Sequence, residues 1–472
     1  MIDRLLHIVG PKGVITDATD MHPYLTDWRE RKHGNALCVV LPASTEEVSA
    51  VLKLAFELQQ PVFPLGGNTG LCYGAVPESR NVDKPGIVLS LRRMNRIRDI
   101  DVISDVITVD AGAILAEVHQ AADNVERQFP MHLGAEGSAQ IGGLISTNAG
   151  GTAVVRYGPM RDLVAGLEVV LADGRILKDL AALRKDNTGY QLRHLFIGAE
   201  GTLGVITGAA LKLFPKLSNS AHAWIDVASP ADAVKLLSAF RATAGQFIEA
   251  FELVSASQFA LVQRHVDRVR IPFSALPEWS LMVELSTSDA HTDLDAMMGE
   301  LLEASFEAGL IRDAVVASSK QQAEEIWHVR HSVSEANKKE GVGIVHDVAV
   351  RTSCVPGFIE AADTVSAERF PQAVTQVVCH LGDGNVHYIL MFPHEHWATI
   401  PDKDAFALDV ERAIHDVGAQ FGGTFSAEHG VGRKLPEELA RLADPLRYDM
   451  MKSIKQLFDP QNLMNPGVLL MP

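Results

Sequence analysis

The chain has 472 residues, is 47% hydrophobic and carries a formal net charge of -17 from 42 basic and 59 acidic side chains. A chain of this length usually grows more than one hydrophobic core, so we expect at least two domains. The acidic balance excludes a general nucleic-acid binder, which needs a basic surface. Four cysteines without a C-x-x-C pair exclude a disulfide framework.

Neither a secretion signal nor a membrane span is predicted. Residues Met1-Ile-Asp-Arg-Leu-Leu-His7 lack the continuous apolar region of a signal peptide. No run approaches the roughly eighteen apolar residues that a membrane span needs. We therefore expect a soluble, cytoplasmic protein, and peripheral docking at a membrane surface stays open.

Short strands and helices alternate in the first part of the chain. Ser44-Thr-Glu-Glu47 matches a helix capping box, and apolar residues at helical spacing continue to Leu58. A short strand over 62–65 precedes the glycine-rich turn 66–70. Further strands are predicted at 87–91 and 106–109, and a helix at 113–122.

Glycine is unusually frequent from Gly134 to Thr207. Asp173-Gly174 lies between two apolar runs and predicts a two-residue hairpin. Closing strands are expected at 204–207 and 210–214, and Pro215 marks a domain boundary. We therefore divide the chain into residues 1–215 and 216–472.

The second part is predicted to be an α+β domain. Helices are expected at 231–243 and 290–308, and strands at 281–286 and 376–380. The tail Leu457-Phe-Asp-Pro-Gln-Asn-Leu-Met-Asn-Pro-Gly467 is turn-rich. Such a tail frays unless it docks, so its specific sequence predicts a docked segment.

Two glycine-rich loops suit a nucleotide cofactor. Pro64-Leu-Gly-Gly-Asn-Thr-Gly70 permits close approach of the backbone to a phosphate, although any glycine cluster can be a simple tight turn. The second loop, residues 134–151, adds six glycines. It also contains Ile141, Leu144 and Ile145, which a solvated linker would not carry. No G-x-G-x-x-G fingerprint is present, so a nicotinamide site is disfavoured.

A metal site is predicted from two histidine motifs. His380-Leu-Gly-Asp-Gly-Asn-Val-His387 places two imidazoles around a turn, an arrangement that alone is more often an ordinary hairpin. Ser426-Ala-Glu-His-Gly430 adds a carboxylate and a third imidazole. His380, His387 and Glu428 then make a three-ligand site with open positions, as in catalytic centres. We expect Zn²⁺, and iron or manganese suits the same ligands. His429 is a proton acceptor.

These motifs, with Gly198-Ala-Glu-Gly-Thr-Leu-Gly-Val-Ile-Thr207 and Asn465-Pro-Gly467, resemble the vanillyl-alcohol oxidase flavoprotein family. The branch is that of the FAD-dependent D-2-hydroxyacid dehydrogenases, which includes D-2-hydroxyglutarate and D-lactate dehydrogenases and the flavin subunit of glycolate oxidase. The resemblance covers nearly the whole chain. It implies an FAD-binding domain of two α+β subdomains, followed by an α+β substrate domain whose sheet is flanked by helices and whose tail returns to the flavin.

The resemblance also implies which residues hold FAD. The first loop would cradle the pyrophosphate, the second would line the flavin and adenine path, and the tail would reach the isoalloxazine ring. No histidine lies in the first loop, so FAD is expected to be non-covalent. The implied residues are Pro64, Gly66, Gly67, Asn68, Thr69, Gly70, Leu71, Gly137, Ser138, Gly142, Gly143, Thr147, Asn148, Gly151, Gly204, Ile206 and Asn465.

The chemistry implied is oxidation of a D-2-hydroxy acid to the 2-oxo acid. The substrate would chelate the metal, His429 would take the hydroxyl proton and also contact the substrate, and hydride would pass from C2 to flavin N5. Arg330 would clamp the substrate carboxylate, with Ser334 and Asn385 beside the substrate. Many relatives carry a lysine where this chain has Val345. D-lactate therefore competes with D-2-hydroxyglutarate as the expected substrate.

The electron acceptor is not identified by any motif. A quinone or an electron-transfer flavoprotein is implied, and a homodimer is compatible with the sequence. Two other interpretations stay open: a non-flavin metalloenzyme, either a facial-triad oxygenase or a hydrolase, and a flavin subunit of a larger electron-transfer complex. The first leaves both glycine loops without a role. The second is disfavoured by the complete set of metal ligands and base.

Overall fold

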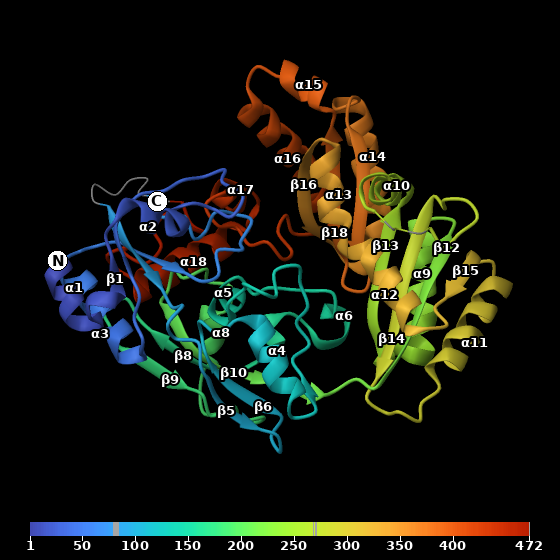
Figure 1. Ribbon diagram of the computed structural model, residues 1–472. Helices are drawn as coiled ribbons and strands as arrows, with labels where there is room; N and C mark the ends of the chain where they lie inside the picture. Colours follow the sequence, from blue (N-terminus) through green and yellow to red (C-terminus); the bar gives the residue numbers. More distant parts are fainter. Residues whose placement is uncertain (79–84, 268, 270, 472) are drawn as a thin grey trace. The chain divides into compact units, whose positions relative to one another are not determined.

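The computed structural model describes residues 1–78, 85–267, 269 and 271–471. It divides into two compact units. The first comprises Met1–Gly151, Tyr157–Lys216 and Glu428–Pro472, and the second comprises Thr152–Arg156 and Leu217–Ala427. The division between Lys216 and Leu217 falls beside Pro215, whereas Thr152–Arg156, which the sequence analysis placed in the first domain, belongs to the second unit. Residues 428–472, which the sequence analysis grouped with the second domain, belong to the first unit (Figure 1).

The first unit contains a four-stranded sheet in the order β1-β2-β4-β3, in which β2, β4 and β3 are parallel. The predicted helix over 45–58 is α3, and the Ser44 side chain accepts a hydrogen bond from the Glu47 amide at 3.2 Å. The elements are α1 (Ile2–Val9), a 3-10 turn η1 (Pro11–Gly13), β1 (Val14–Ile15), α2 (Ala18–Leu25), β2 (Ala36–Val40), α3 (Thr45–Glu57), β3 (Val62–Leu65) and β4 (Gly86–Ser90).

A second, antiparallel sheet of this unit has the order β5-β6-β10-β8-β9. The predicted Asp173-Gly174 hairpin joins β8 to β9, and Val170 pairs with Ile176. One bulged strand, β10, replaces the two short strands expected at 204–207 and 210–214. The elements are β5 (Ile97–Asp101), β6 (Val106–Asp110), α4 (Leu115–Asp123), β7 (Arg127–Gln128), α5 (Ile141–Ser146), α6 (Val154–Tyr157), α7 (Met160–Leu163), β8 (Val164–Val170), β9 (Ile176–Asp179), α8 (Arg193–Phe196), β10 (Val205–Lys212) and β11 (Phe214–Pro215).

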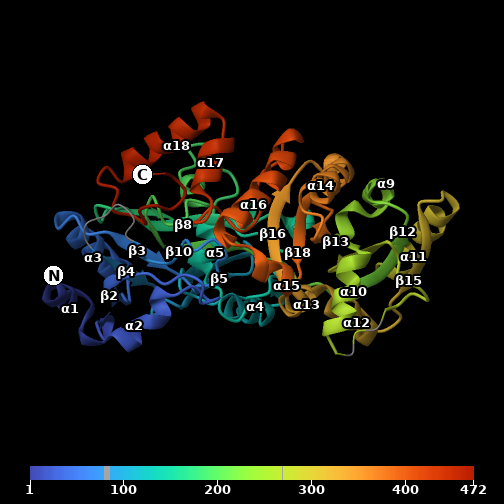
Figure 2. The ribbon, with the colours of Figure 1, turned by 90° about the horizontal axis from the view of Figure 1, so that it is seen from above.

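The returning segment of the first unit carries α17 (Pro436–Leu442) and α18 (Pro445–Phe458), drawn in red in Figure 2. It is held by backbone bonds to β3. The Val62 amide donates to Leu463 O, and the Asn465 amide donates to Val62 O, both at 2.8 Å. The buried ammonium of Lys455 donates to Met464 O at 2.8 Å and to Thr202 O at 2.9 Å. The tail is therefore docked, as its sequence predicts.

The second unit is built on a seven-stranded antiparallel sheet in the order β15-β12-β14-β13-β17-β18-β16 (Figure 1). Its strands are β12 (Asn219–Val227), β13 (Ile248–Ser255), β14 (Trp279–Thr287), β15 (Ile311–Val316), β16 (Val342–Ala349), β17 (Val374–His380) and β18 (Asn385–Phe392). Its helices and turns are α9 (Pro230–Ala244), η2 (Gly245–Phe247), α10 (Ala256–His265), α11 (Leu294–Glu307), α12 (Lys320–His331), α13 (Val333–Glu340), η3 (Thr352–Cys354), α14 (Val355–Arg369), α15 (His394–Thr399) and α16 (Lys403–Gln420).

Helices cover both faces of this sheet. On one face, residues of α9, α11, α14 and α16 form an apolar cluster with strand residues that include Leu253 and Cys379. On the other face, residues of α10, α12 and α13 pack against Val254 and Val378. Because neighbouring strand residues point to opposite faces, Cys379 faces away from His380 and lies in the apolar cluster. Within the described residues, no helix has the length and hydropathy to span a membrane.

Candidate active site

A cleft in the first unit is lined by the loop after β3, the start of α5, the start of β10 and the returning segment. Most of the residues predicted to hold FAD lie along this one cleft, and His429 lines it as well. The predicted residues on its wall are Pro64, Gly66, Gly67, Asn68, Thr69, Gly70, Gly142, Gly143, Thr147, Gly204, Ile206 and Asn465. The other five, Leu71, Gly137, Ser138, Asn148 and Gly151, are not on the described wall.

The two glycine loops lie against one another. A Cβ on Gly67 would stand 2.0 Å from the carbonyl oxygen of Ser138, so no side chain fits there. A Cβ on Gly66 would stand 3.4 Å from Gly143 Cα. Asn68 adopts φ 56°, a left-handed conformation that asparagine tolerates. Along these two loops the cleft wall is thus mainly backbone, which suits a pyrophosphate and a planar ring system.

Two predicted residues off the wall support the loop from behind. The Asn148 side chain accepts a hydrogen bond from the Arg161 amide at 2.9 Å. Gly151 packs so closely that a Cβ would stand 2.4 Å from His132 O. The family resemblance implied both residues for the cofactor path, and neither is among the residues that line the cleft. It could not distinguish a residue facing the cleft from one behind the loop.

Asn465 is buried, with a relative exposure of 3%, and all of its polar groups are used. Its amide nitrogen donates to Glu200 O at 2.8 Å and to Gly74 O at 3.1 Å. Its side-chain oxygen accepts from Arg433 at 2.9 Å. Asn465 therefore fixes the tail at the cleft wall.

Glu200 is a wall residue that the sequence analysis did not single out. Its two carboxylate oxygens accept from the amides of Val431 and Gly432, both at 2.8 Å. Burial nevertheless raises the pKa of Glu200 to about 7. The sequence pattern that could have identified Glu200 is an acidic residue within the glycine-rich stretch Gly198-Ala-Glu-Gly201.

In the second unit, the Gly-Asp-Gly turn brings His380 and His387 together, as its spacing predicts. The two ring centroids are 5.3 Å apart, with an interplanar angle of 79°. The Asp383 carboxylate accepts from the Asn385 amide at 3.0 Å and so braces the turn. Gly384 has φ 85°, and a Cβ there would stand 2.1 Å from Val350 O.

Glu252 and Arg330 complete a charged group around His380. Glu252 of β13 accepts from His380 Nδ1 and from Arg330 Nε, both at 2.7 Å. Burial alone would raise the pKa of this carboxyl, but the charges of His380 and Arg330 lower the pKa of Glu252 to about 2. The carboxylate can only accept, so Nδ1 carries the proton and the His380 Nε2 lone pair is directed away from Glu252.

Asp347 organises the other side of this group. Its carboxylate lies 3.8 Å from His387 Nδ1 and accepts from Asn385 Nδ2 at 3.0 Å. Asn385 also donates to Val348 O at 3.1 Å, so both donors of its amide bind protein groups. The Ala427 amide donates to Asp347 O at 3.0 Å, and Glu428 and His429 follow it directly in the chain.

Two further residues of the sequence analysis, Ser334 and Val345, lie on α13 and β16 of the second unit. Ser334 is exposed on α13. The helix is interrupted at Ser332, between α12 and α13, so Ser334 and Arg330 lie on different helices. Val345 is 40% exposed and lies two residues before Asp347 on β16. Period-two alternation places Val345 and Asp347 on the same sheet face.

Comparison with known families accounts for both units. The family described as "FAD binding domain" matches residues 36–179, and that described as "FAD linked oxidases, C-terminal domain" matches residues 216–469. The mitochondrial D-2-hydroxyglutarate dehydrogenase of Arabidopsis thaliana is 34% identical, covering 97% of this chain and 79% of the relative. D-2-hydroxyglutarate dehydrogenase of Stutzerimonas stutzeri is 32% identical, covering 99% and 98%.

Solved structures share the fold. A substrate-bound p-cresol methylhydroxylase superposes with a TM-score of 0.76 at 17% identity, covering 99% of this chain and 95% of the other. An alkyldihydroxyacetonephosphate synthase superposes with a TM-score of 0.73 at 16% identity, covering 98% and 84%. At these identities the likeness establishes the fold alone; together with the FAD-binding match over residues 36–179, it confirms the expected α+β flavoprotein architecture.

Proposed function

The chain belongs to the FAD-linked oxidases, and on that premise we propose that it is an FAD-dependent dehydrogenase of D-2-hydroxy acids. The observation that carries this proposal is the backbone-walled cleft of the first unit, within a chain about one-third identical to D-2-hydroxyglutarate dehydrogenases. The FAD-binding match argues against the non-flavin interpretation. The product is the corresponding 2-oxo acid.

FAD, when bound, accepts the hydride that leaves C2 of the substrate. We propose that the first loop holds its pyrophosphate, since the Gly67 position leaves no room for a side chain and the backbone is bare there. The second loop and β10 hold the remainder of the dinucleotide. No histidine lies in the first loop, so the attachment is non-covalent.

We propose that His380, His387 and Glu428 hold a divalent cation, with Zn²⁺ as the first choice. This is supported by Glu252, which fixes the tautomer of His380, an arrangement typical of metal-binding histidines. It is also supported by Asp347, which holds Ala427, the residue before Glu428. A cation at these ligands, when bound, lowers the pKa of the substrate hydroxyl.

His429 is the proposed acceptor of the hydroxyl proton. It lines the cofactor cleft and follows the proposed ligand Glu428 in the chain. Arg330 is the proposed partner of the substrate carboxylate. Its Nε donates to Glu252, and its Nη2 lies 3.4 Å from His380 Nε2, so the guanidinium stands beside the proposed metal ligand, where it can donate to a substrate carboxylate. Ser334 and Asn385 remain proposed substrate neighbours, although the amide donors of Asn385 are already engaged.

D-2-hydroxyglutarate is the first proposed substrate, because the similar relatives are named for it. D-lactate is the second, because Val345 gives the sheet face of Asp347 an exposed apolar side chain, which cannot pair with the second carboxylate of a dicarboxylic acid. Comparing kcat/KM for the two acids decides between them. A quinone or an electron-transfer flavoprotein is the proposed electron acceptor, with a homodimer and a cytoplasmic location as further proposals.

His429→Ala tests the proposed base. The variant should retain FAD but lose reduction by the substrate roughly 10²- to 10⁴-fold, the range for removal of a general base. Anaerobic bleaching of the flavin absorbance measures both properties. His394→Ala, which removes an exposed histidine of α15, is the matched control. Reduction of His429→Ala at the rate of the unaltered protein would exclude His429 as the base.

A further inference from the structure

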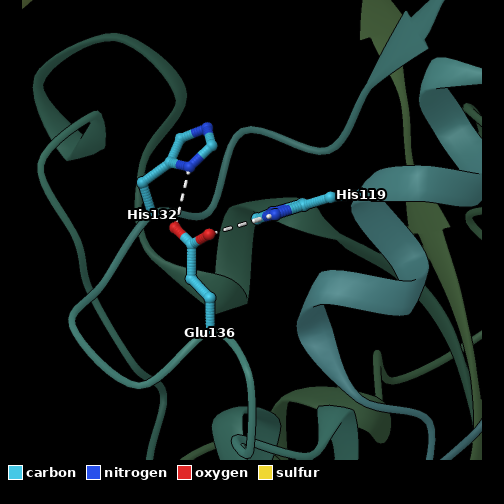
Figure 3. A group of neighbouring side chains, drawn as sticks. All are labelled: His119, His132 and Glu136. Atoms are coloured by element: carbon cyan, nitrogen blue, oxygen red, sulfur yellow. Dashed lines mark hydrogen bonds and ion pairs between the residues drawn. The ribbon is translucent and has the colours of Figure 1, made fainter. Parts of the chain in front are cut away.

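A second group of potential metal ligands lies in the first unit, on residues with no role in the proposed chemistry. His119 projects from α4, and His132 and Glu136 project from the segment between β7 and α5, where the second glycine-rich loop begins (Figure 3). Both imidazole rings point toward the Glu136 carboxylate. We propose that His119, His132 and Glu136 bind a divalent transition-metal ion such as Zn²⁺.

The spacing of the donor atoms suits one small ion. His132 Nδ1 lies 2.9 Å from Glu136 Oε1, and His119 Nδ1 lies 3.5 Å from Glu136 Oε2. One donor atom from each residue falls within 4.8 Å of the other two. Tetrahedral zinc with bonds of about 2.0–2.1 Å needs donors roughly 3.3 Å apart. Small side-chain rotations are therefore sufficient to bind the ion.

The charges of the group also favour a cation. Burial raises the pKa of the Glu136 carboxyl, but hydrogen bonds from His119 and His132 hold that pKa well below its ordinary value. The carboxylate is thus anionic at neutral pH. The two imidazole centroids are only 4.8 Å apart, so two protonated rings would repel each other. Two neutral rings on one cation avoid this repulsion.

Accessibility distinguishes the three ligands. The His132 side chain is 49% exposed and that of Glu136 is 35% exposed, which leaves a route for the ion and room for a bound water. His119 is 19% exposed, and its Nε2 is buried without a hydrogen-bond partner among the described residues. The polar contacts of this ring are therefore made through Nδ1, on the side of Glu136.

An ion at this position would tie the loop to α4. The Ala116 amide of α4 already donates to Glu136 O at 3.1 Å, and the Leu115 amide donates to Ala139 O at 2.9 Å. Ser138 lies between these points, and its carbonyl oxygen faces Gly67 at the FAD cleft. We infer that the ion stabilises the second wall of the cleft and slows the release of FAD. This role goes beyond the proposed dehydrogenase chemistry and shares no ligand with it.

Metal stoichiometry tests the site in the full-length holoenzyme. The protein is stripped with a chelator, equilibrated with buffered Zn²⁺ and analysed for bound zinc by mass spectrometry. His132→Ala and Glu136→Gln should each bind one zinc per chain fewer than the unaltered protein. Glu136→Gln keeps the side-chain size, and His132 is half-exposed, so both variants should fold; thermal unfolding checks this. His291→Ala, at an exposed histidine of the second unit, is the control.

A second variant separates this site from the proposed catalytic one. His387→Ala should also lose one zinc, and the double variant His132→Ala/His387→Ala should lose two. If His132→Ala lowers the zinc content and His387→Ala does not, the metal site proposed at His380, His387 and Glu428 is excluded, while the site at His119, His132 and Glu136 is supported. Unchanged zinc content in both His132→Ala and Glu136→Gln would overturn the present inference. FAD release should slow with zinc in the unaltered protein and become zinc-independent in His132→Ala; equal zinc dependence would exclude the stabilising role.

Discussion

The two units build their sites from different parts of the polypeptide. In the first unit the cleft wall is mainly backbone, and its shape depends on glycines such as Gly67, where a side chain would not fit. In the second unit the site is made of charged side chains, and its shape depends on strand register. There Glu252 pairs with His380, and Asp347 pairs with His387, across neighbouring strands.

The difference determines what each site tolerates. A backbone cradle is disrupted by an added atom at a closely packed position such as Gly67, but it is indifferent to the charge of surrounding residues. A register-built site accepts small changes in volume, but it loses function when one charged partner is removed and the others stay buried. Substitutions that add a methyl group or neutralise a carboxylate therefore distinguish the two designs.

Gly67→Ala should have the largest effect in the first unit. Its new Cβ would stand 2.0 Å from Ser138 O, so one of the two loops must move. Overpacking of this kind costs about 1–3 kcal/mol, or roughly a 5- to 150-fold loss in FAD affinity if the strain falls on the bound state. Equilibrium titration of the apoprotein with FAD measures the change.

Gly134→Ala is the matched control, because a Cβ there meets nothing within 4 Å. It should leave the FAD affinity unchanged. Equal affinities in Gly67→Ala and the unaltered protein would mean that the loop contact does not shape the cofactor site.

Glu252→Gln should weaken metal binding at the site of the second unit. The neutral amide no longer holds His380 and Arg330 by charge, and loss of such a supporting carboxylate typically costs 10- to 100-fold in metal affinity. Competition with a zinc-binding dye measures that affinity. Glu284→Gln, which changes a carboxylate of β14 that accepts from Trp327 at 2.7 Å, should leave it unchanged. Comparable losses in the two variants would indicate a general stability effect.

Glu252→Gln should also change how the free energy of unfolding depends on pH in acid. Because the pKa of Glu252 is lowered from 4.5 to about 2, its ionised form stabilises the folded state above pH 4.5. That contribution is lost as the pH falls toward 2. Chemical unfolding as a function of pH should show a shallower loss in Glu252→Gln over this window.

Cys379→Ala should have the smallest effect. The thiol lies in the apolar cluster on the opposite face from His380. Its removal should cost about 1 kcal/mol of stability through the cavity left behind, with zinc content and turnover unchanged. Loss of zinc in this variant would mean that Cys379 and His380 do not face opposite sides of the sheet.

Local signals in the sequence predict much of this structure. The Ser44 cap, the Asp173-Gly174 hairpin and the turn between His380 and His387 each follow from residues that are neighbours in the chain. Glu252 lies 128 residues from His380, and only the pairing of β13 with β17 brings them together. The grouping of Glu428–Pro472 with the first unit also depends on distant contacts, such as Asn465 with Val62.

The discontinuous first unit has a consequence for biosynthesis. Its cleft needs His429 and Asn465, which leave the ribosome only after the whole of Leu217–Ala427. The second unit can therefore fold during translation, whereas the first must wait with β3 lacking its backbone partners Leu463 and Asn465. We therefore expect FAD to be loaded late, after the returning segment has joined the first unit.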